Sequence, residues 1–362
     1  MTKNLLKNCF CIIIIAVAAY GCKKDSKKAQ PTPAVTNIAT LGLYEYQYPS
    51  STDRRIFIPI NKIGTKSISY LSVFDTGSSG MTIDANGILP ASMITSSGIQ
   101  FTGDSVVVSG ITVTSTTGVM SYGDATGLVN EYGNIAYAVV SIGDGTTGTF
   151  TTKRIPLFLY YKVEDMTTGD VEPAHSNDVF GVGPGTSYAS DLISSPLSYL
   201  NLTTGQIAGF KLATLSSASF TSNNVTNVSD VLTIGLTPDD VNNSGFIMHP
   251  LTLYTVGGYS ADIPATISYG TTTLAGQILF DTGTPSITII EQPNNLPDST
   301  QVTIVTDKGF KYSYLTMSTS NLTAVENPNV TDDPRTIFSL DFFVHNEYLL
   351  DYSDHKIGLK NN

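Results

Sequence analysis

Two aspartates, Asp75 and Asp281, stand in nearly the same short phrase of sequence, 206 residues apart. Each follows an apolar run that ends in phenylalanine, and each opens an Asp-Thr-Gly triplet followed by a hydroxyl residue. Two carboxyl groups that face each other at about 3 Å cannot both ionise cheaply, so such a pair holds one proton over a range of pH. The charged carboxylate then takes a proton from a bound water, and the protonated carboxyl donates toward a carbonyl oxygen. The repeat therefore predicts a site that adds water to a carbonyl group without a covalent intermediate.

The hydroxyl residues of the two phrases can position such a pair. Thr76 and Thr282 are expected to bond across to the backbone of the opposite loop and to hold the two loops together. Ser78 and Thr284 follow the two glycines and can donate to the outer oxygens of the carboxylates. Hydroxyl donation favours the ionised form and lowers the pKa of a carboxyl group. We therefore expect hydrolysis to be fastest at acidic pH.

The glycines of the triplets supply the backbone part of the site. Gly77 and Gly283 permit a tight loop in which backbone N–H groups approach the carboxylates. One isolated Asp-Thr-Gly is more often an Asx-type turn at the end of a strand. Two copies with the same apolar lead, separated by the length of one medium-sized domain, favour the paired-carboxylate interpretation over that alternative.

The composition favours a β-rich fold. Hydrophobic residues make up 41% of the 362, and charged residues only 14%, well below the usual share of about 25%. Short alternating runs recur from about residue 41 onward and are broken by Gly, Asn, Asp and Ser. The runs that we predict as strands are RRIFIPI, SISYLSVF, SVVVSGITVTS, NIAYAVVSI, RIPLFLYY, DVLTIGL, ATISYG, QILFDTG, SITII, QVTIV and YLLDY.

Few segments have helical character. Residues 189–202 and 237–242 can each hold a helical turn or more. The polar stretch over residues 215–230 has no clear period, and we expect it to be the crossover between two halves of the chain.

Charge and motif content exclude several classes of function. Six of the 19 Lys and Arg residues lie in residues 1–28 against one acid, which leaves 13 basic and 29 acidic residues in the remainder, a net charge of −16 there. A nucleic-acid partner needs a basic face, so we expect none. The four histidines show no zinc-ligand spacing, and no phosphate-binding glycine loop opens a helix. We therefore expect neither a metal nor an organic cofactor.

The N-terminal segment has the pattern of a targeting signal. Two lysines precede an apolar stretch over residues 9–20 that is too short to span a membrane as a mature helix. The small residues before Cys22 resemble the lipobox of bacterial lipoproteins, in which the cysteine is lipidated and becomes the first residue. The resemblance implies a signal peptide over residues 1–21, and the Lys- and Pro-rich composition after it predicts a flexible tether over residues 22–40.

This pattern also predicts a location. A lipobox implies a cell-envelope lipoprotein of the outer membrane, held by its N-terminal lipid anchor and facing either the periplasm or the outside. Plain secretion with cleavage nearby is the alternative. All three cysteines lie in residues 1–22, so the mature body has neither a disulfide nor a thiol nucleophile.

In its two Asp-Thr-Gly triplets and their surroundings, the chain resembles the pepsin-like aspartic proteases over roughly residues 41–362. The resemblance implies an all-β, bilobal pepsin-like aspartic protease fold, in which two related β-barrel-like lobes enclose a central cleft. We expect the N-terminal lobe, with the first aspartate and the flap, over residues 41–214. We expect the C-terminal lobe, with the second aspartate, over residues 215–362.

A further segment resembles the flap of that family. Tyr122, Gly123 and Asp124 begin 47 residues after Asp75, in the place of the hairpin whose tyrosine closes over the substrate. An ordinary hairpin tyrosine is the alternative for Tyr122 taken alone. Some fungal members carry an aspartate at the position of Asp124 and accept lysine in the pocket before the scissile bond. The resemblance therefore implies tolerance for a basic residue at that subsite.

Other positions match the family less evenly. Residues 178–183, DVFGVG, resemble the segment that braces the first catalytic loop from beneath, whereas residues 337–340, in the place of the second brace, lack the usual glycine. The family usually has a tryptophan bonded to the flap tyrosine, but this chain has no tryptophan, and Thr82 stands at that position. Pro285 stands where the second loop usually has serine.

The resemblance implies an aspartic endopeptidase in which Asp75 and Asp281 activate a water to cleave the peptide bonds of polypeptide substrates. We expect the protein to be a monomer. A catalytically inactive pepsin-like binding or inhibitor protein on the cell surface is the alternative, although such a protein has no need of both aspartates and their hydroxyl partners. A surface adhesin of unrelated all-β fold is a third possibility.

Overall fold

The computed structural model describes most of the chain after the predicted tether. The described residues are 38–49, 53–124, 127–143, 148–200, 202–222, 224–284, 287–291, 299–316, 322–326 and 328–362. The predicted signal peptide, Cys22 and nearly all of the predicted tether lie outside these ranges. Within them, we find no helix with the length and apolar character that a membrane span requires.

The largest sheet combines strands from the first 250 residues of the chain with its last two strands. Its members are rich in the β-branched and aromatic residues that suit a pleated surface. In the order in which they pair, the 14 strands are β16 (Ile247–Pro250), β25 (Lys356–Asn361), β24 (Asn346–Asp351), β14 (Ile207–Leu212), β15 (Thr226–Leu236), β1 (Ala39–Gln47), β2 (Arg54–Ile63), β3 (Lys66–Asp75), β11 (Val179–Val182), β4 (Ser79–Asp84), β10 (Phe150–Asp165), β9 (Gly127–Ile142), β8 (Ile111–Asp124) and β7 (Ser105–Val108).

Part of this sheet closes on itself. The strands β2, β3, β11, β4, β10 and β9 pair in that order, and an additional pairing of β9 with β2 completes the ring. Side chains alternate between the two faces of a strand, so every second residue can face the inside. In β2, Ile56, Ile58 and Ile60 are fully buried, while the residues between them are partly exposed. This ring forms the predicted β-barrel-like architecture around the first aspartate.

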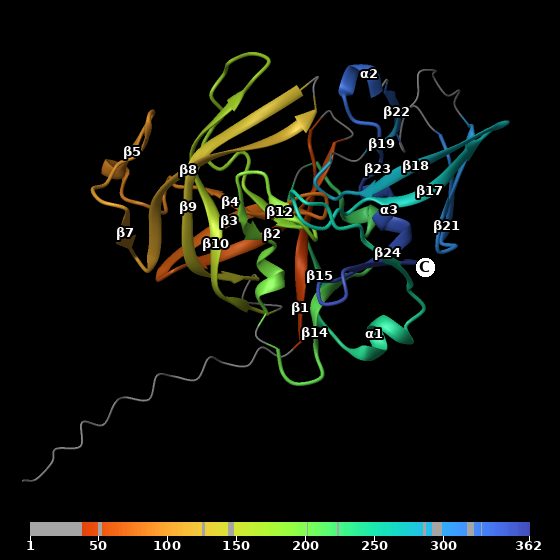
Figure 1. Cartoon of the computed structure of the whole chain (residues 1–362), viewed down its shortest axis with the longest axis horizontal. Coiled ribbons are helices and arrows are strands. Elements are labelled where there is room, and N and C mark those ends of the chain that lie inside the picture. Colours follow the sequence, from red (N-terminus) through yellow and green to blue (C-terminus); the bar gives the residue numbers. More distant parts are fainter. Residues whose placement is uncertain are drawn as a thin grey trace, which may run out of the picture. The chain divides into compact units, whose positions relative to one another are not determined.

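A second sheet surrounds the other aspartate. Figure 1 shows its strands in cyan and blue, apart from the yellow strands β8, β9 and β10. In pairing order, the seven strands are β21 (Lys311–Leu315), β20 (Gln301–Thr306), β17 (Ile263–Tyr269), β18 (Thr272–Phe280), β23 (Thr336–Phe338), β19 (Ile287–Glu291) and β22 (Leu322–Glu326). One hydrophobic cluster of buried residues includes side chains from both sheets. The chain is therefore all-β, as the sequence predicts.

Short helices and small hairpins complete the described part of the chain. The predicted helix near residue 238 is confirmed, because Thr237 and Asp240 form a capping box at the start of α1 (Pro238–Asn242). The other elements are α2 (Pro328–Thr331), α3 (Leu340–His345), 3₁₀ turns at Ala91–Met93, Pro196–Tyr199 and Ser217–Ser219, and two-stranded sheets of β5 (Ile94–Thr95) with β6 (Gly98–Ile99) and of β12 (Thr186–Ser187) with β13 (Ser190–Ser194).

Two expectations about the middle of the chain hold only in part. Residues 189–202 contain one helical turn, the 3₁₀ turn at Pro196–Tyr199, but β13 occupies their first part. The polar stretch 215–230 is not a crossover throughout, because β15 begins at Thr226 and pairs with β1. The strands β14 and β15 stand on either side of the predicted lobe boundary at 214/215 and pair with each other. That boundary stays a prediction.

Candidate active site

Each predicted catalytic aspartate stands at the end of a buried strand. Asp75 is the last residue of β3, and Asp281 follows β18 directly. The phenylalanines that precede them, Phe74 and Phe280, are buried in the hydrophobic cluster. Apolar strand ends thus carry both carboxyl groups into the interior, where Asp75 is only 6% exposed.

The strand β11 braces the loop that carries Asp75, the first of the two predicted catalytic loops. It pairs parallel with the end of β3, where Gly181 lies opposite Asp75, and antiparallel with β4 on its other side. The loop between β3 and β4 therefore passes over β11. A Cβ atom on Gly181 would lie 2.8 Å from Oγ of Ser78, so this close packing requires glycine. The predicted brace is confirmed.

The second catalytic loop has the same arrangement with a different residue. The strand β23 pairs parallel with β18 and antiparallel with β19, and the Asp281 N–H donates to the Phe338 carbonyl at 2.8 Å. Ser339, which replaces the expected glycine, donates through Oγ to the Thr284 carbonyl at 2.6 Å. The missing glycine therefore does not remove the brace, because the serine hydroxyl fastens the loop instead. Pro285 lies outside the described residues.

Thr76 and Thr282 clamp the two loops together reciprocally. Oγ1 of Thr76 donates to the Phe280 carbonyl at 2.8 Å, and Oγ1 of Thr282 donates to the Phe74 carbonyl at 2.6 Å. Each hydroxyl also accepts the backbone N–H of the other threonine, at 3.1 and 3.0 Å. Both side chains are fully buried. Four hydrogen bonds shielded from water thus fix the position of one triplet relative to the other.

The first loop encloses the Asp75 carboxylate with donors. Its Oδ1 accepts the backbone N–H groups of Gly77 and Ser78 at 2.7 and 3.0 Å. Its Oδ2 accepts the Ser78 hydroxyl at 2.5 Å. One oxygen is therefore held by backbone and the other by a side chain, which fixes the plane of the carboxyl group.

The second loop repeats this pattern and faces the first. Oδ1 and Oδ2 of Asp281 accept from Gly283 N–H and Thr284 Oγ1 at 2.7 and 2.6 Å. A Cβ atom on Gly283 would lie 2.3 Å from Cγ of Asp75, and one on Gly77 would lie 2.5 Å from Cγ of Asp281. Each glycine therefore packs against the carboxyl group of the opposite loop, and the two carboxyl groups meet between them.

The meeting of the two carboxyl groups changes the acidity of Asp75. Burial raises its pKa most, and the negative charge of Asp281 and a hydrogen bond with the Asp281 carboxyl raise it further. Donation by Ser78 lowers the pKa, but burial outweighs it. The pair consequently keeps a proton to higher pH than hydroxyl donation alone would allow.

The flap segment forms the predicted hairpin. The strands β8 and β9 pair antiparallel up to Asp124 opposite Gly127. Gly123 has a φ of +100°, and a Cβ atom there would collide with the Gly127 carbonyl, so the turn requires glycine. Oη of Tyr122 lies 3.4 Å from Oγ1 of Thr82, the residue that stands in place of tryptophan. The Asp124 side chain lies outside the described part, and lysine tolerance there stays a prediction.

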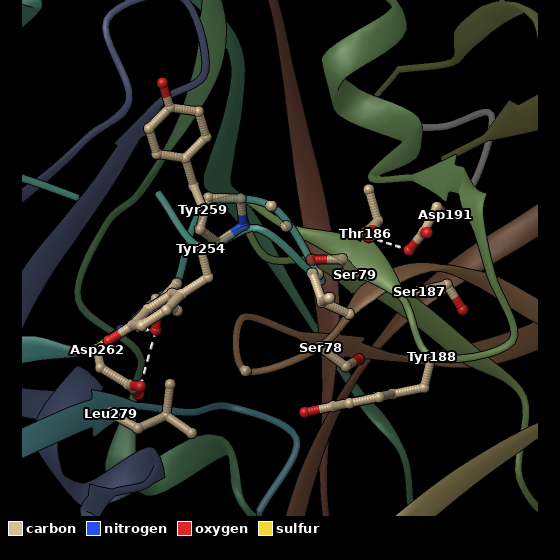
Figure 2. A pocket seen from close by; sticks show the side chains of 18 of the residues that line it. Ser78, Ser79, Thr186, Ser187, Tyr188, Asp191, Tyr254, Tyr259, Asp262 and Leu279 are labelled. Atoms are coloured by element: carbon tan, nitrogen blue, oxygen red, sulfur yellow. Dashed lines mark hydrogen bonds between the residues drawn. The ribbon is translucent and has the colours of Figure 1, made fainter. Parts of the chain in front are cut away.

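A pocket of about 370 Å³ opens beside the first catalytic loop. Figure 2 shows Ser78 of that loop together with Tyr188, Tyr254 and Leu279, which line the same pocket. The two tyrosines come from segments far apart in the chain that an isolated bridge between Gly185 and Gly258 holds together. The pocket therefore has aromatic sides and adjoins the predicted catalytic loop.

Arg335, which lines this pocket, is paired with nearby carboxylates. Arg335 donates through Nε and Nη2 to the Asp333 carboxylate at 2.8 and 2.7 Å. Its Nη1 lies 3.5 Å from Oδ1 of Asp262. The one guanidinium lining the pocket is thus already paired among the described residues.

One contact to the site is not predicted from the sequence. Arg55 in β2 donates through Nη1 to the Gly283 carbonyl at 2.7 Å and so holds the second catalytic loop from the first barrel-like sheet. Its only sequence signal is a pair of arginines that open a strand in a chain where charged residues are scarce. Within the described ranges, no group of three or more His, Cys, Asp or Glu residues is arranged to hold a metal ion.

Comparison with known proteins places this geometry in a known fold. No protein-family model matches the chain, and no curated protein matches its sequence. Among solved structures, the aspartic proteinase from Irpex lacteus matches with a TM-score of 0.55, covering 90% of this chain and 98% of that chain at 14% sequence identity. The chain has the pepsin-like aspartic proteinase fold. At this identity the likeness establishes the pepsin-like fold alone, and the activity has to be inferred from the site.

Proposed function

We propose that the chain is an aspartic-type endopeptidase, which cleaves peptide bonds with a water held between Asp75 and Asp281. The observation that carries this proposal is the reciprocal clamp of Thr76 and Thr282, which brings the two carboxyl groups face to face. The pepsin-like fold and the raised pKa of Asp75 support it. Paired carboxyl groups of unequal acidity are what general acid–base catalysis of hydrolysis requires.

The proposed reaction proceeds while the dyad holds one proton. The ionised carboxylate takes a proton from the water as the water oxygen bonds to the carbonyl carbon, and the protonated carboxyl gives its proton to the carbonyl oxygen. This step yields a tetrahedral gem-diol, with no bond between enzyme and substrate. When the C–N bond breaks, the newly protonated carboxyl protonates the leaving amine, and the other carboxyl recovers a proton from the gem-diol. The dyad again holds one proton.

The substrate is a polypeptide in this proposal. The hairpin that carries Tyr122 would cover its backbone and exclude water during the reaction. The pocket beside Ser78 would receive one of its side chains. The enzyme would need neither a metal nor an organic cofactor, because the two carboxyl groups supply both the base and the acid.

An inhibitor of the pepstatin type, which carries a statine residue, tests the proposed function. Its hydroxyl-bearing carbon imitates the tetrahedral intermediate, so it binds such a site far more tightly than a substrate does. We expect it to raise the melting temperature of the wild-type protein and to block cleavage of a denatured polypeptide. The Asp75→Asn variant is the control and should bind much more weakly. An unchanged melting temperature of the wild type would contradict the proposal, and binding without any cleavage would favour an inactive relative.

We also propose that the protein is a monomeric lipoprotein of the outer membrane, anchored through Cys22 after removal of residues 1–21. The apolar stretch and the lipobox-like residues before Cys22 support this location. We expect the native protein to partition into the detergent phase on Triton X-114 extraction and the Cys22→Ala variant to stay in the aqueous phase. Equal partitioning of the two proteins would refute lipidation at this residue.

A further inference from the structure

Glu131 is a buried carboxyl group with few hydrogen bonds to offset the cost of its burial. It lies in β9, on the second strand of the flap hairpin, opposite Met120 of β8. Its Oε1 lies 3.3 Å from Oγ1 of Thr82, and its Oε2 has no hydrogen-bond partner in the described part of the chain. A buried polar group without partners costs free energy, so its presence in a native core needs an explanation.

The surroundings of Glu131 favour its neutral form. Burial raises its pKa well above the usual range, against the hydrogen bond with Thr82, which lowers it. The negative charges of Asp178 and Asp84 raise the pKa further. Both of these carboxylates accept several hydrogen bonds. The other titratable groups in this region are Tyr122, which Glu131 and Asp178 influence, Tyr160, whose hydroxyl donates to Asp178, and His175, whose Nδ1 lies 2.7 Å from the same carboxylate.

Thr82 connects Glu131 to the flap tyrosine, since its Oγ1 lies 3.4 Å from Oη of Tyr122. A threonine hydroxyl has one hydrogen and can donate to only one of these neighbours. If Glu131 is ionised, Thr82 donates to Glu131. If Glu131 is neutral, the carboxylic acid is the stronger donor, so Oε1–H donates to Thr82 and Thr82 donates to Tyr122. In that state the tyrosine keeps its own hydrogen for another acceptor.

Tyr122 lies two residues before the end of β8 in the flap hairpin. The charge of Asp75 is close enough to raise the pKa of the Tyr122 hydroxyl, although burial and the charge of Glu131 raise it more. We propose that Glu131 is the positioning residue of the flap: as a neutral acid it donates through Thr82 and turns the Tyr122 hydroxyl hydrogen toward the bound polypeptide. This inference rests on the proposed endopeptidase function, because it assigns the hydrogen to a substrate carbonyl.

Kinetics of four variants test the chain of donors. Tyr122→Phe removes the hydrogen itself, and we expect kcat/KM to fall about tenfold, mainly through KM. Thr82→Val and Glu131→Leu interrupt the chain, and each should match Tyr122→Phe within about twofold. Glu131→Gln keeps a donor in its amide and should retain the wild-type KM. Adding Thr82→Val to Tyr122→Phe should cause no further loss, because both changes remove the same interaction.

A purely structural role for Glu131 would give a different pattern. Losses that multiply in the Thr82→Val/Tyr122→Phe double variant would overturn the proposal, and so would a Glu131→Gln variant as impaired as Glu131→Leu. Thr114→Val is the matched control for Thr82→Val, because it removes a threonine hydroxyl outside the donor chain, one in β8 that donates to the Ile135 carbonyl at 2.7 Å. That variant should leave KM unchanged.

Carbon-13 NMR of tyrosine labelled at Cζ gives a readout that does not depend on activity. The Tyr122 resonance is identified by its absence from the Tyr122→Phe spectrum, and it responds to hydrogen bonding at Oη. We expect it to move in Thr82→Val and Glu131→Leu and to stay in place in Glu131→Gln. An unmoved resonance in Thr82→Val would overturn the proposal even in an active enzyme. A moved resonance in a protein that cleaves no peptide would support the donor chain and refute only the endopeptidase function.

Discussion

We expect Asp75→Asn and Asp281→Asn each to lower kcat/KM for peptide hydrolysis by ~10³-fold or more, since either change removes a partner from the acid–base pair. An asparagine preserves the shape of the site but can neither take a proton from water nor give one to the carbonyl oxygen. Cleavage of an internally quenched peptide, measured with each purified variant, checks this result. The matched control is Asp104→Asn at an exposed position. Either dyad variant retaining even a tenth of wild-type activity would contradict the assigned roles.

The Asp75→Asn substitution should stabilise the fold while it removes activity. The folded-state pKa of Asp75 is raised above its unfolded value, mainly by burial. Such a group makes its full contribution to the stability of the fold at pH values below its pKa in the unfolded chain. This contribution is lost as the pH rises through its pKa in the folded protein. We therefore expect the variant to melt higher than wild type at pH 8 and close to wild type at pH 4. A variant that melts lower than wild type at pH 8 would mean that the ionised Asp75 carboxylate does not destabilise the folded state at that pH.

The second large effect concerns the clamp. We expect Thr76→Val or Thr282→Val to lower the free energy of unfolding by about 3 kcal/mol, because each leaves a buried carbonyl and a buried N–H without partners. The double variant should lose less than the sum of the two, since both threonines hold the same pair of loops and their hydroxyl oxygens lie 3.4 Å apart. Urea unfolding measures all three variants, and peptide cleavage should fall in parallel as the carboxyl groups lose their alignment.

Serine variants distinguish the contribution of the threonine hydroxyl to stability from that of its methyl group. Thr76→Ser keeps every hydrogen bond of the clamp and loses only a buried methyl, which costs about 1 kcal/mol. If the valine and serine variants at this position are equally destabilised, the hydrogen bonds across the two loops do not hold the site together.

The parts of the site that the sequence predicts are those with strong local signals. Asp75 and Asp281 each follow an apolar run, and such a run becomes a buried strand wherever it can pack. The flap hairpin and the brace β11 are predicted through the resemblance to the pepsin-like family. The structure adds the physical reason for their glycines, since Gly123 has a positive φ and Gly181 packs too closely against Ser78 for a Cβ atom.

Other parts depend on contacts that no local pattern records. Arg55 reaches a loop 228 residues away, and Ser339 replaces an expected glycine through a hydrogen bond to a residue 55 positions away. Glu131 occupies an otherwise ordinary strand position, and only the folded hairpin of β8 and β9 brings it to Thr82 in β4. These residues are identified by three-dimensional neighbours rather than by sequence period.

The middle of the chain shows how tertiary contacts can override local preference. Residues 190–194 have some helical spacing, yet they form β13, with Ile193 buried in the cluster beneath the flap. Pro196 opens the 3₁₀ turn, where its missing N–H has no cost, but it would break a helix that ran into it from residues 190–195. The burial of one isoleucine against β10 and the flap thus decides the conformation of this segment.

The most direct test of the central claim is digestion of acid-denatured haemoglobin or casein by the purified wild-type protein from pH 3 to pH 8, beside Asp75→Asn at the same concentration. The claim is that Asp75 and Asp281 share one proton and activate water for peptide hydrolysis. It predicts cleavage in the acidic part of this range, a decline once the pair loses its proton at higher pH, and no cleavage by the variant. Intact substrate at every pH with the wild-type protein, or equal digestion by both proteins, would contradict it.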